Sequence, residues 1–192
     1  MRRLLFVGAA ALLAAGAFSQ EFKLGSKVSD FSLKEVSGAP VALEKLKGQL
    51  TVIGFIATKC PISNDYNERM KALYADYHGK GVHFIFINSN STEPAAEVAE
   101  HTRSNGFPFP VYKDDDNVVA DRFGAEFTPE VYVLDQEGVI RYHGAIDDSR
   151  VAARIKTHHL RKGLDAMLAG RPVETAHTRA FGCTIKRAKK AS

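Results

Sequence analysis

The sequence has 192 residues, of which 45% are hydrophobic and 25% are charged, and its formal net charge is +4 at pH 7. This length suits one well-packed domain and excludes two comfortable ones. Two of the 26 basic residues, Arg2 and Arg3, belong to a predicted export signal, so the remainder nearly balance the 22 acidic residues. No aromatic residues alternate with the basic residues at 186–190, so the sequence predicts no nucleic-acid surface.

The N-terminal sequence predicts that the protein is exported. Arg2 and Arg3 precede an apolar run over residues 4–18, which ends in small residues and a polar segment. This order is typical of a secretory signal peptide, and the run is short for a membrane span. We therefore predict a signal peptide at residues 1–19 and a periplasmic or secreted protein with no other contact with the membrane. An uncleaved N-terminal membrane anchor is the alternative.

The next elements are predicted to be a short hairpin, a buried strand and a helix. Residues 25–43 alternate in polarity around a turn, as in a hairpin. Residues 51–58 are almost all apolar or β-branched, which is typical of a central strand covered on both faces. Pro61 then begins a helix. Its apolar residues recur every three or four positions, and glycines end it at 79–81.

The remaining elements alternate in the same way. A second buried strand is predicted at residues 82–88, and a helix follows between 91 and 106. After a short strand near 111, residues 115–117 are predicted to cap a short helix. The last predicted elements of the domain are a hairpin at residues 131–143 and a helix at 151–168.

This order of elements predicts an α/β fold with three α/β/α layers around a central mixed sheet and an N-terminal hairpin extension. One domain over residues 20–172 accounts for all of these elements. Residues 173–192 have little helical or strand periodicity, and we predict that they form a C-terminal extension that carries Cys183.

The chemistry is predicted to centre on Cys60, at the turn from the first buried strand into the first helix. The free amides and the positive dipole of a helix N-terminus favour a thiolate, which lowers the pKa of the thiol and makes it nucleophilic. Pro61 defines the helix start, and Lys59 adds a cation if its side chain folds back. An inert or structural Cys60 is the alternative.

Ser63 stands where a Cys-x-x-Cys motif has its second thiol. A serine cannot resolve a mixed disulfide, so another thiol must do so. Cys183 is the only other cysteine, and we expect a flexible Gly182 to help it reach Cys60. Cys183 is therefore a predicted resolving cysteine. A permanent structural bridge to Cys60 and an independent thiol remain open, since an oxidising compartment favours disulfides.

The pair Thr128-Pro129 precedes the strand expected beside that of Cys60. A cis proline here would leave a backbone edge free to pair with a bound peptide or thiol substrate. Composition alone favours a trans proline that opens an ordinary strand.

These motifs resemble the thioredoxin superfamily, in particular its redoxin branch, which includes alkyl hydroperoxide reductases and thiol-specific antioxidants. The resemblance covers residues 27–172, and the tail at 181–186 is similar to that of exported peroxiredoxin-like proteins. It implies a thioredoxin fold, a nucleophilic Cys60, and either thiol–disulfide exchange or peroxide reduction. It also implies a cis Pro129 and a set of residues that support the active site: Thr58, Lys59, Pro61, Ser63, Thr128 and Pro129.

The departures from the peroxiredoxin pattern favour disulfide exchange. Peroxiredoxins carry Pro-x-x-x-Thr-x-x-Cys and a distant arginine, but this chain has Ile53 and Ala57 at the first two positions. Thr58 lies one residue too late, and Arg141 lies on the following strand. Such preorganised donors are worth about 3 kcal/mol of barrier each. The expected partners are therefore protein or small-molecule thiols and disulfides, with peroxides as the alternative.

Two further alternatives need no exchange chemistry. An extracytoplasmic copper site could use Cys60, Cys183 and histidines, but His158 and His159 are adjacent on a predicted helix and diverge. A non-catalytic redoxin scaffold would keep a fixed bridge between the cysteines. We predict no cofactor and no metal site.

Overall fold

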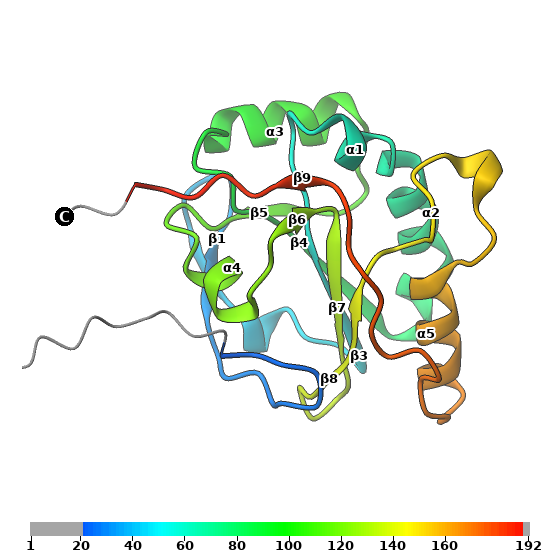
Figure 1. Cartoon of the computed structure of the whole chain (residues 1–192). Coiled ribbons are helices and arrows are strands. Elements are labelled where there is room, and N and C mark those ends of the chain that lie inside the picture. The colour runs from blue at the N-terminus through cyan, green and yellow to red at the C-terminus, as the bar shows by residue number, and fades with distance from the viewer. Residues whose placement is uncertain (1–20, 190–192) are drawn as a thin grey trace, which may run out of the picture.

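The computed structural model describes residues 21–189, and a mixed sheet of seven strands lies at its centre (Figure 1). The strand order is β2-β1-β5-β4-β3-β7-β8, and β6 and β9 form a separate two-stranded sheet. The strands are β1 (Ser32–Lys34), β2 (Pro40–Ala42), β3 (Leu50–Phe55), β4 (Val82–Asn88), β5 (Val111–Lys113), β6 (Phe127–Thr128), β7 (Glu130–Leu134), β8 (Ile140–Gly144) and β9 (Cys183–Thr184).

The three middle strands explain where the site lies. β3 is buried along its whole length, as its apolar sequence predicts, and it runs parallel to β4, which runs parallel to β5. The carboxyl ends of parallel strands meet at one edge of a sheet, where ligands bind in open α/β folds. Cys60 follows β3 at this edge.

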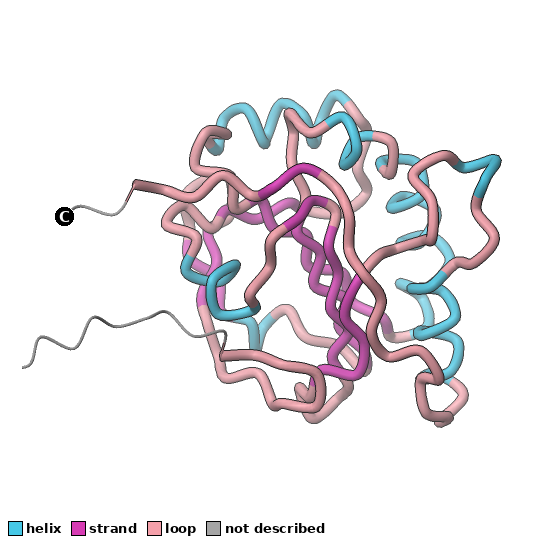
Figure 2. The backbone as a smooth tube through the Cα atoms, in the orientation of Figure 1, coloured by secondary structure: helices cyan, strands magenta, loops and turns pink. Residues whose placement is uncertain are grey.

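Helices cover both faces of the sheet, which confirms the predicted three-layer arrangement (Figure 2). One hydrophobic cluster packs α2 (Asn67–Tyr77), α3 (Ala95–Ser104) and α5 (His159–Leu168) on one face. A second cluster packs α4 (Val118–Phe123) and the segment that begins at Phe22 on the other. The predicted signal peptide lies outside the described residues. No helix within residues 21–189 is long and apolar enough to span a bilayer.

The N-terminal hairpin is more closely integrated than an extension. β1 pairs with β2, as predicted, and also with β5, where Lys34 lies opposite Lys113. The hairpin therefore forms one edge of the main sheet.

The helix predicted from Pro61 is divided in two. α1 (Pro61–Asn64) is a single turn, and α2 begins three residues later. Between them the Tyr66 N–H donates to the Ser63 carbonyl (3.0 Å), three residues back instead of four. The tyrosine is almost fully buried, and its hydroxyl donates to the Ser149 carbonyl (3.1 Å). This tertiary contact explains a break that the apolar period does not predict.

The helix predicted over residues 151–168 is wrong in its first half. Residues 152–154 form a 3-10 turn, and α5 begins only at His159. Residues 151–154 are all exposed, so they have no apolar face to bury. Asp148 closes the following loop: its carboxylate accepts from the Lys156 N–H (3.0 Å), and its own N–H donates to the Thr157 carbonyl (3.1 Å).

The C-terminal extension packs against the domain and forms a short strand, although its sequence has little strand periodicity. It crosses the carboxyl edge of the sheet in red in Figure 1 and contributes β9. Before β9, the Thr178 N–H donates to the His143 carbonyl (3.0 Å). After β9, Ile185 is buried, and its N–H donates to the Glu126 carbonyl (2.9 Å).

Candidate active site around Cys60

The structure joins the two cysteines in a disulfide. Cys60 and Cys183 are separated by 123 residues, and their Cα atoms lie 5.9 Å apart, within the usual range for such a bond. Cys60 is only 4% exposed, whereas Cys183 is partly exposed. The bridge spans most of the domain and ties the C-terminal extension to the start of α1.

Cys60 occupies the cap position of α1, as the sequence predicts, with Pro61 in the first turn. The Ser63 N–H lies 3.3 Å from the Cys60 Sγ and donates to it. A donated hydrogen bond stabilises a thiolate. Because α1 has only four residues, its macrodipole adds less than the longer helix of our prediction would, and this amide is the main local support.

The Ser63 side chain has a structural contact of its own. It is 1% exposed, and its hydroxyl accepts a hydrogen bond from the Ala57 N–H (3.1 Å). The hydroxyl thus ties the end of the first buried strand to α1, at the position where a Cys-x-x-Cys motif has its second thiol.

Ser63→Cys is expected to move the disulfide. The new thiol would share the α1 turn with Cys60 and compete with Cys183, which would then be released in a large fraction of the oxidised molecules. Alkylation of oxidised protein and peptide mass spectrometry measure the free Cys183. Ser63→Ala is the control and should keep Cys183 fully protected. Equal protection in both variants would contradict the prediction.

Glu93 holds the loop that precedes Cys60. Its carboxylate accepts from the Thr58 N–H (2.9 Å), the Lys59 N–H (3.0 Å) and the Asn88 amide (2.5 Å), and the residue is 3% exposed. Burial raises the pKa of Glu93, but these hydrogen bonds outweigh it, so the pKa lies below its ordinary value. An ionised, buried carboxylate therefore orients the backbone next to the cysteine.

The Lys59 side chain is paired with α3. Its Nζ lies 2.8 Å from the Glu97 carboxylate and donates to the Thr92 carbonyl (3.1 Å). The Thr58 hydroxyl donates to the same carboxylate (2.9 Å). The cation that we expected beside Cys60 is thus compensated by Glu97, because a carboxylate attracts it more strongly than a thiol does.

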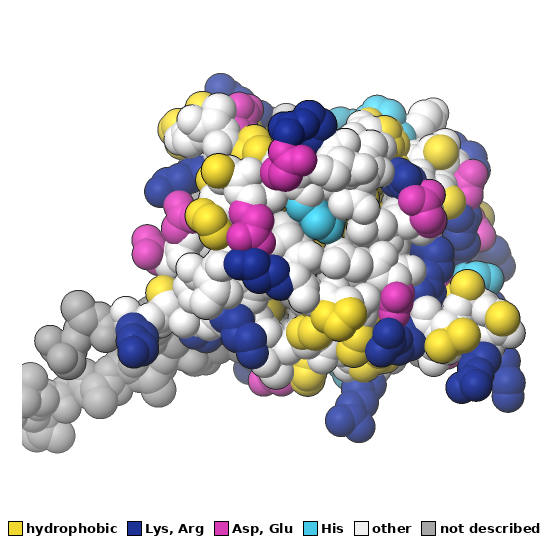
Figure 3. Space-filling model, turned by 90° about the horizontal axis from the view of Figure 1, so that it is seen from above, with side chains coloured by type: hydrophobic (Ala, Val, Ile, Leu, Met, Phe, Trp, Pro, Cys, Tyr) yellow, Lys and Arg dark blue, Asp and Glu magenta, His cyan; other side chains and the backbone are white. Residues whose placement is uncertain are grey.

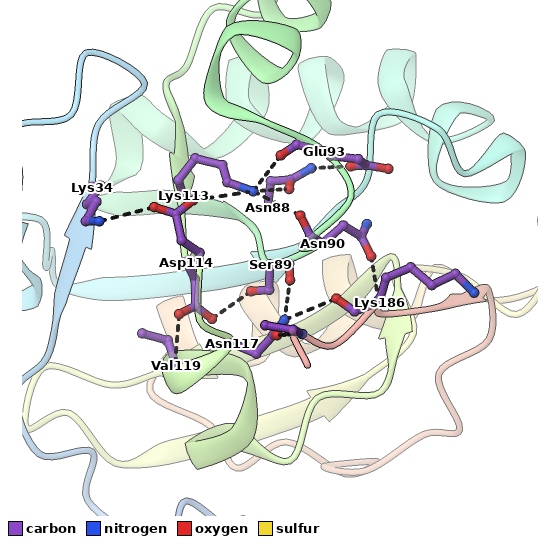
Figure 4. A network of polar contacts seen from close by, with 12 residues as sticks. Lys34, Asn88, Ser89, Asn90, Glu93, Lys113, Asp114, Asn117, Val119 and Lys186 are labelled. Carbon is purple, nitrogen blue, oxygen red and sulfur yellow. Dashed lines mark hydrogen bonds and ion pairs between the residues drawn. The ribbon is translucent and has the colours of Figure 1, made fainter. Parts of the chain in front are cut away.

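Buried polar residues at the ends of β4 and β5 extend this arrangement (Figure 4). The Lys113 ammonium donates to the Asn88 side chain (2.9 Å) and to the carbonyls of Asn90 (3.1 Å) and Glu93 (2.8 Å). Burial lowers the pKa of Lys113, although nearby carboxylates oppose this shift. The Asn90 side chain in turn accepts from the Lys186 N–H (2.7 Å). One network therefore connects the Cys60 loop to the C-terminal segment.

Asp114 caps α4 in place of the residues predicted to do so at 115–117. It is 6% exposed, and its carboxylate accepts from the N–H groups of Val119 (3.1 Å) and Ala120 (3.0 Å) and from the Ser89 hydroxyl (2.9 Å). The first turn of α4 is therefore capped from inside the protein by a residue that precedes the predicted cap.

The Thr128–Pro129 peptide bond is cis, as the resemblance implies. The Thr128 carbonyl oxygen lies 3.5 Å from the Cys60 Sγ. In the two-stranded sheet, Thr128 lies opposite Cys183, and its hydroxyl donates to the Cys183 carbonyl (3.3 Å). The edge predicted to receive a bound peptide is therefore occupied by the chain's own C-terminal segment.

Gly182 allows β9 to lie close to β6, whereas we expected this glycine to make the segment flexible. A Cβ at this position would overlap the Thr128 carbonyl oxygen and would lie 2.7 Å from the Thr128 carbonyl carbon and 3.3 Å from the Pro129 nitrogen. Only a glycine lets β9 lie this close to β6.

Glu130 supports the other side of the site, directly after the cis proline. It is 3% exposed and accepts from the N–H groups of Glu126 and Phe127 (2.9 Å each) and from the Tyr132 hydroxyl (3.1 Å). Its carboxylate also lies 2.6 Å from the His143 Nε2. Burial raises the pKa of Glu130, but the hydrogen bonds, that to His143 foremost, outweigh it and lower the pKa. The loop that pairs with β9 is thereby held in place.

The structure brings the predicted site residues together around Cys60, but the sequence did not predict the buried polar network behind them. Glu93, Lys113 and Glu130 were not singled out. A signal was present: the polar run at 88–90 begins at the last residue of an apolar strand, at the same sheet edge as Cys60.

The residues that would complete a peroxiredoxin pattern do not gather at Cys60. Arg141 pairs with Asp135 (2.5 Å) near the end of β7 that is distant from Cys60. Ala57 has no hydroxyl, and Thr58 bonds Glu97. Within residues 21–189, no group of three His, Cys, Asp or Glu side chains could hold a metal ion.

Comparisons with known proteins agree with this geometry. A model of the AhpC/TSA family matches residues 24–143. The thiol-disulfide oxidoreductase ResA of Halalkalibacterium halodurans is 27% identical over 122 residues, which cover 63% of this chain and 68% of that protein. The thioredoxin-like protein YneN of Bacillus subtilis is 30% identical over 118 residues, covering 61% of this chain and 68% of that protein.

A solved structure of an uncharacterized conserved protein from Geobacillus kaustophilus is similar over a longer range. It is 35% identical, has a TM-score of 0.82, and covers 88% of this chain and 95% of that one. The predicted thioredoxin fold and redoxin resemblance are confirmed. The chain belongs to the AhpC/TSA family and is a thiol-dependent oxidoreductase.

Proposed function

We propose that the protein is an exported thiol–disulfide oxidoreductase in which Cys60 is the nucleophile and Cys183 is the resolving cysteine. The observation that carries this proposal is the Cys60–Cys183 bridge itself, which pairs a sulfur at a helix cap with one on a strand beside the cis-proline loop. The substrates are disulfides of proteins or small molecules, in keeping with the family.

The proposed cycle needs no other group in the chain. The Cys60 thiolate, stabilised by the Ser63 N–H, attacks one sulfur of a substrate disulfide and expels the other as a thiolate. The Cys183 thiolate then attacks the Cys60 Sγ, forms the observed bridge and releases the second substrate thiolate. The substrate gains two electrons, the cysteine pair loses two, and the protons of the two thiols pass to the released thiolates.

Turnover with a disulfide substrate tests the roles of the two cysteines. With insulin as substrate and dithiothreitol as donor, Cys60→Ser is expected to lower the rate at least ~100-fold, as the loss of a nucleophile does. Cys183→Ser should instead accumulate a mixed disulfide on Cys60, visible by mass spectrometry. A bridge that resists dithiothreitol, with turnover unaffected by either variant, would identify a structural disulfide in its place.

Export is the second part of the proposal. It is supported by the basic, apolar and small-residue pattern at 1–19 and by a disulfide that suits an oxidising compartment. Cell fractionation and mass spectrometry of the mature N-terminus test it. Cleavage after residue 17 or 19 supports a periplasmic or secreted protein, an intact N-terminus in the membrane fraction supports the anchor, and an uncleaved protein in the cytoplasm would contradict both.

A further inference from the structure

The two sulfurs of the bridge differ in access. Cys60 is 4% exposed and lies between the Ser63 N–H (3.3 Å) and the Thr128 carbonyl (3.5 Å). Cys183 lies on β9, which pairs with β6 on one side, and within residues 21–189 no strand pairs with its other edge. Cys183 is partly exposed, and the following Thr184 is exposed. An incoming molecule therefore meets Cys183 first.

The segment that carries Cys183 is fastened on both sides. Before β9, the Thr178 hydroxyl accepts from the Ala145 N–H (3.0 Å). After it, the Lys186 N–H donates to the Asn90 side chain (2.7 Å; Figure 4). The buried Ile185 and the hydrogen bond from the Ser91 N–H to the Lys186 carbonyl (2.9 Å) also hold the chain in place. The segment thus covers Cys60 through contacts that do not depend on the disulfide.

The described surface on the side of this segment has a mixed character. Seen from above in Figure 3, this end of the molecule has basic, acidic and hydrophobic side chains in small groups. Among residues 21–189, the exposed large hydrophobic residues are far apart in the sequence: Leu24, Val36, Val118 and Val151. Access to the sulfur, more than binding to a patch, would then decide where a thiol reacts.

Thiol–disulfide exchange has a direction that matters here. The attacking thiolate, the central sulfur and the leaving sulfur lie in line, so each sulfur must be approached from the side away from the other. Cys183 is partly exposed, so an attacking thiol can reach it from solvent. Cys60 is 4% exposed, and the Ser63 amide and the Thr128 carbonyl contact its sulfur, which leaves little room for a thiol to approach it.

The leaving groups also favour attack on Cys183 over attack on Cys60. Attack on Cys183 expels the Cys60 thiolate, and the Ser63 N–H is in place to stabilise it at 3.3 Å. Attack on Cys60 would expel the Cys183 thiolate, whose sulfur has no hydrogen-bond donor among the contacts of the described residues. A thiolate of lower pKa leaves faster.

We propose that the thiol that reduces the oxidised protein attacks Cys183, so that Cys183 carries the mixed disulfide with the donor while Cys60 leaves as a thiolate. This inference rests on the proposed function. Cys60 thereby faces the substrate disulfide in one half of the cycle, and Cys183 faces the electron donor in the other.

The step balances with a dithiol donor. The first donor thiolate forms a bond to the Cys183 sulfur as the Cys60–Cys183 bond breaks and Cys60 takes the electron pair. The second donor thiolate then attacks the donor's own sulfur in the mixed disulfide and expels the Cys183 thiolate. The donor loses two electrons and becomes a disulfide, the cysteine pair gains two, and the two donor protons go to the protein thiolates.

Trapping the first adduct in the full-length oxidised protein tests the inference. Reduced glutathione is added for short times, the reaction is quenched with excess N-ethylmaleimide, and the two cysteine peptides are analysed by mass spectrometry. Glutathione on Cys183 with N-ethylmaleimide on Cys60 is expected, in at least ~10-fold excess over the reverse pattern.

The other outcomes separate the inference from the proposed function. The reverse pattern, or equal amounts of the two adducts, overturns the inference but leaves disulfide exchange standing. A bridge that stays closed at all glutathione concentrations overturns both. A second arm compares the free cysteine of Cys60→Ser with that of Cys183→Ser: a bulky maleimide should modify Cys183 at least ~10-fold faster than Cys60, and equal rates would count against the covered Cys60.

Discussion

Gly182→Ala is expected to separate β9 from β6 and to make the Cys60–Cys183 bridge easier to open. The new Cβ would overlap the Thr128 carbonyl oxygen and lie 2.7 Å from its carbon. Forcing one methyl group into a packed contact costs about 1–3 kcal/mol. The equilibrium constant for closing the bridge should therefore fall by about 5- to 150-fold, since each 1.4 kcal/mol is a factor of ten. Titration in glutathione redox buffers measures this constant.

The control for this prediction is Gly79→Ala. A Cβ at Gly79 meets no atom within 4 Å, so the bridge should be unchanged. Thermal unfolding adds a second readout: Gly182→Ala should lower the melting temperature of the oxidised protein more than that of the reduced protein, because its strain is greatest when the bridge holds β9 in place. A closing constant equal to that of the parent protein would show that the segment can shift to admit the methyl group.

Glu93→Gln is expected to have the largest effect on stability among the substitutions considered. The carboxylate accepts three hydrogen bonds in a buried place, from Thr58, Lys59 and Asn88. A glutamine amide has one acceptor oxygen and turns an NH2 group toward one of these donors, so at least one of them loses its partner. Losing a charge-assisted buried hydrogen bond costs about 2–4 kcal/mol. Urea unfolding at pH 7 measures the loss.

The pH dependence of this effect has a definite sign. Because the pKa of Glu93 is lowered in the folded protein, ionised Glu93 adds stability above its unfolded pKa of about 4.3, and this stability is lost as pH falls through the folded pKa. The difference in stability between the parent protein and Glu93→Gln should therefore shrink below about pH 4. Glu97→Gln is the matched control: Glu97 lies on α3, and its carboxylate also binds the loop before Cys60. Its side chain is 34% exposed, so we expect a small effect at pH 7. A difference that stays constant from pH 7 to pH 3 would contradict the role assigned to the Glu93 charge.

Both predictions depend on contacts between parts of the chain that are distant in sequence. Features that depend on such contacts are not predicted from the sequence, whereas features with a local signal are. The buried strand β3, the Cys60–Pro61 helix start and the β7–β8 hairpin are predicted correctly because each has a local signal. Apolar runs, a proline in a first turn and the alternation of a hairpin act within a few residues. The cis state of Pro129 follows from the family resemblance and not from local composition.

The errors have a common physical cause. The break after α1 depends on a buried tyrosine that reaches Ser149, and the late start of α5 depends on Asp148 closing its loop. Neither contact leaves a periodic pattern at the affected residues, since tertiary contacts override local propensity.

The sequence by itself determined the fold class, the family and the position of Cys60, the proposed nucleophile, because these follow from local patterns and short motifs. Only the tertiary structure decided that the C-terminal segment occupies the cis-proline edge and that Glu93 and Lys113 support the site beneath it. A strand of two residues has no period to detect. A buried charge is tolerated only when partners from other strands satisfy it, and this pairing exists only after the chain has folded.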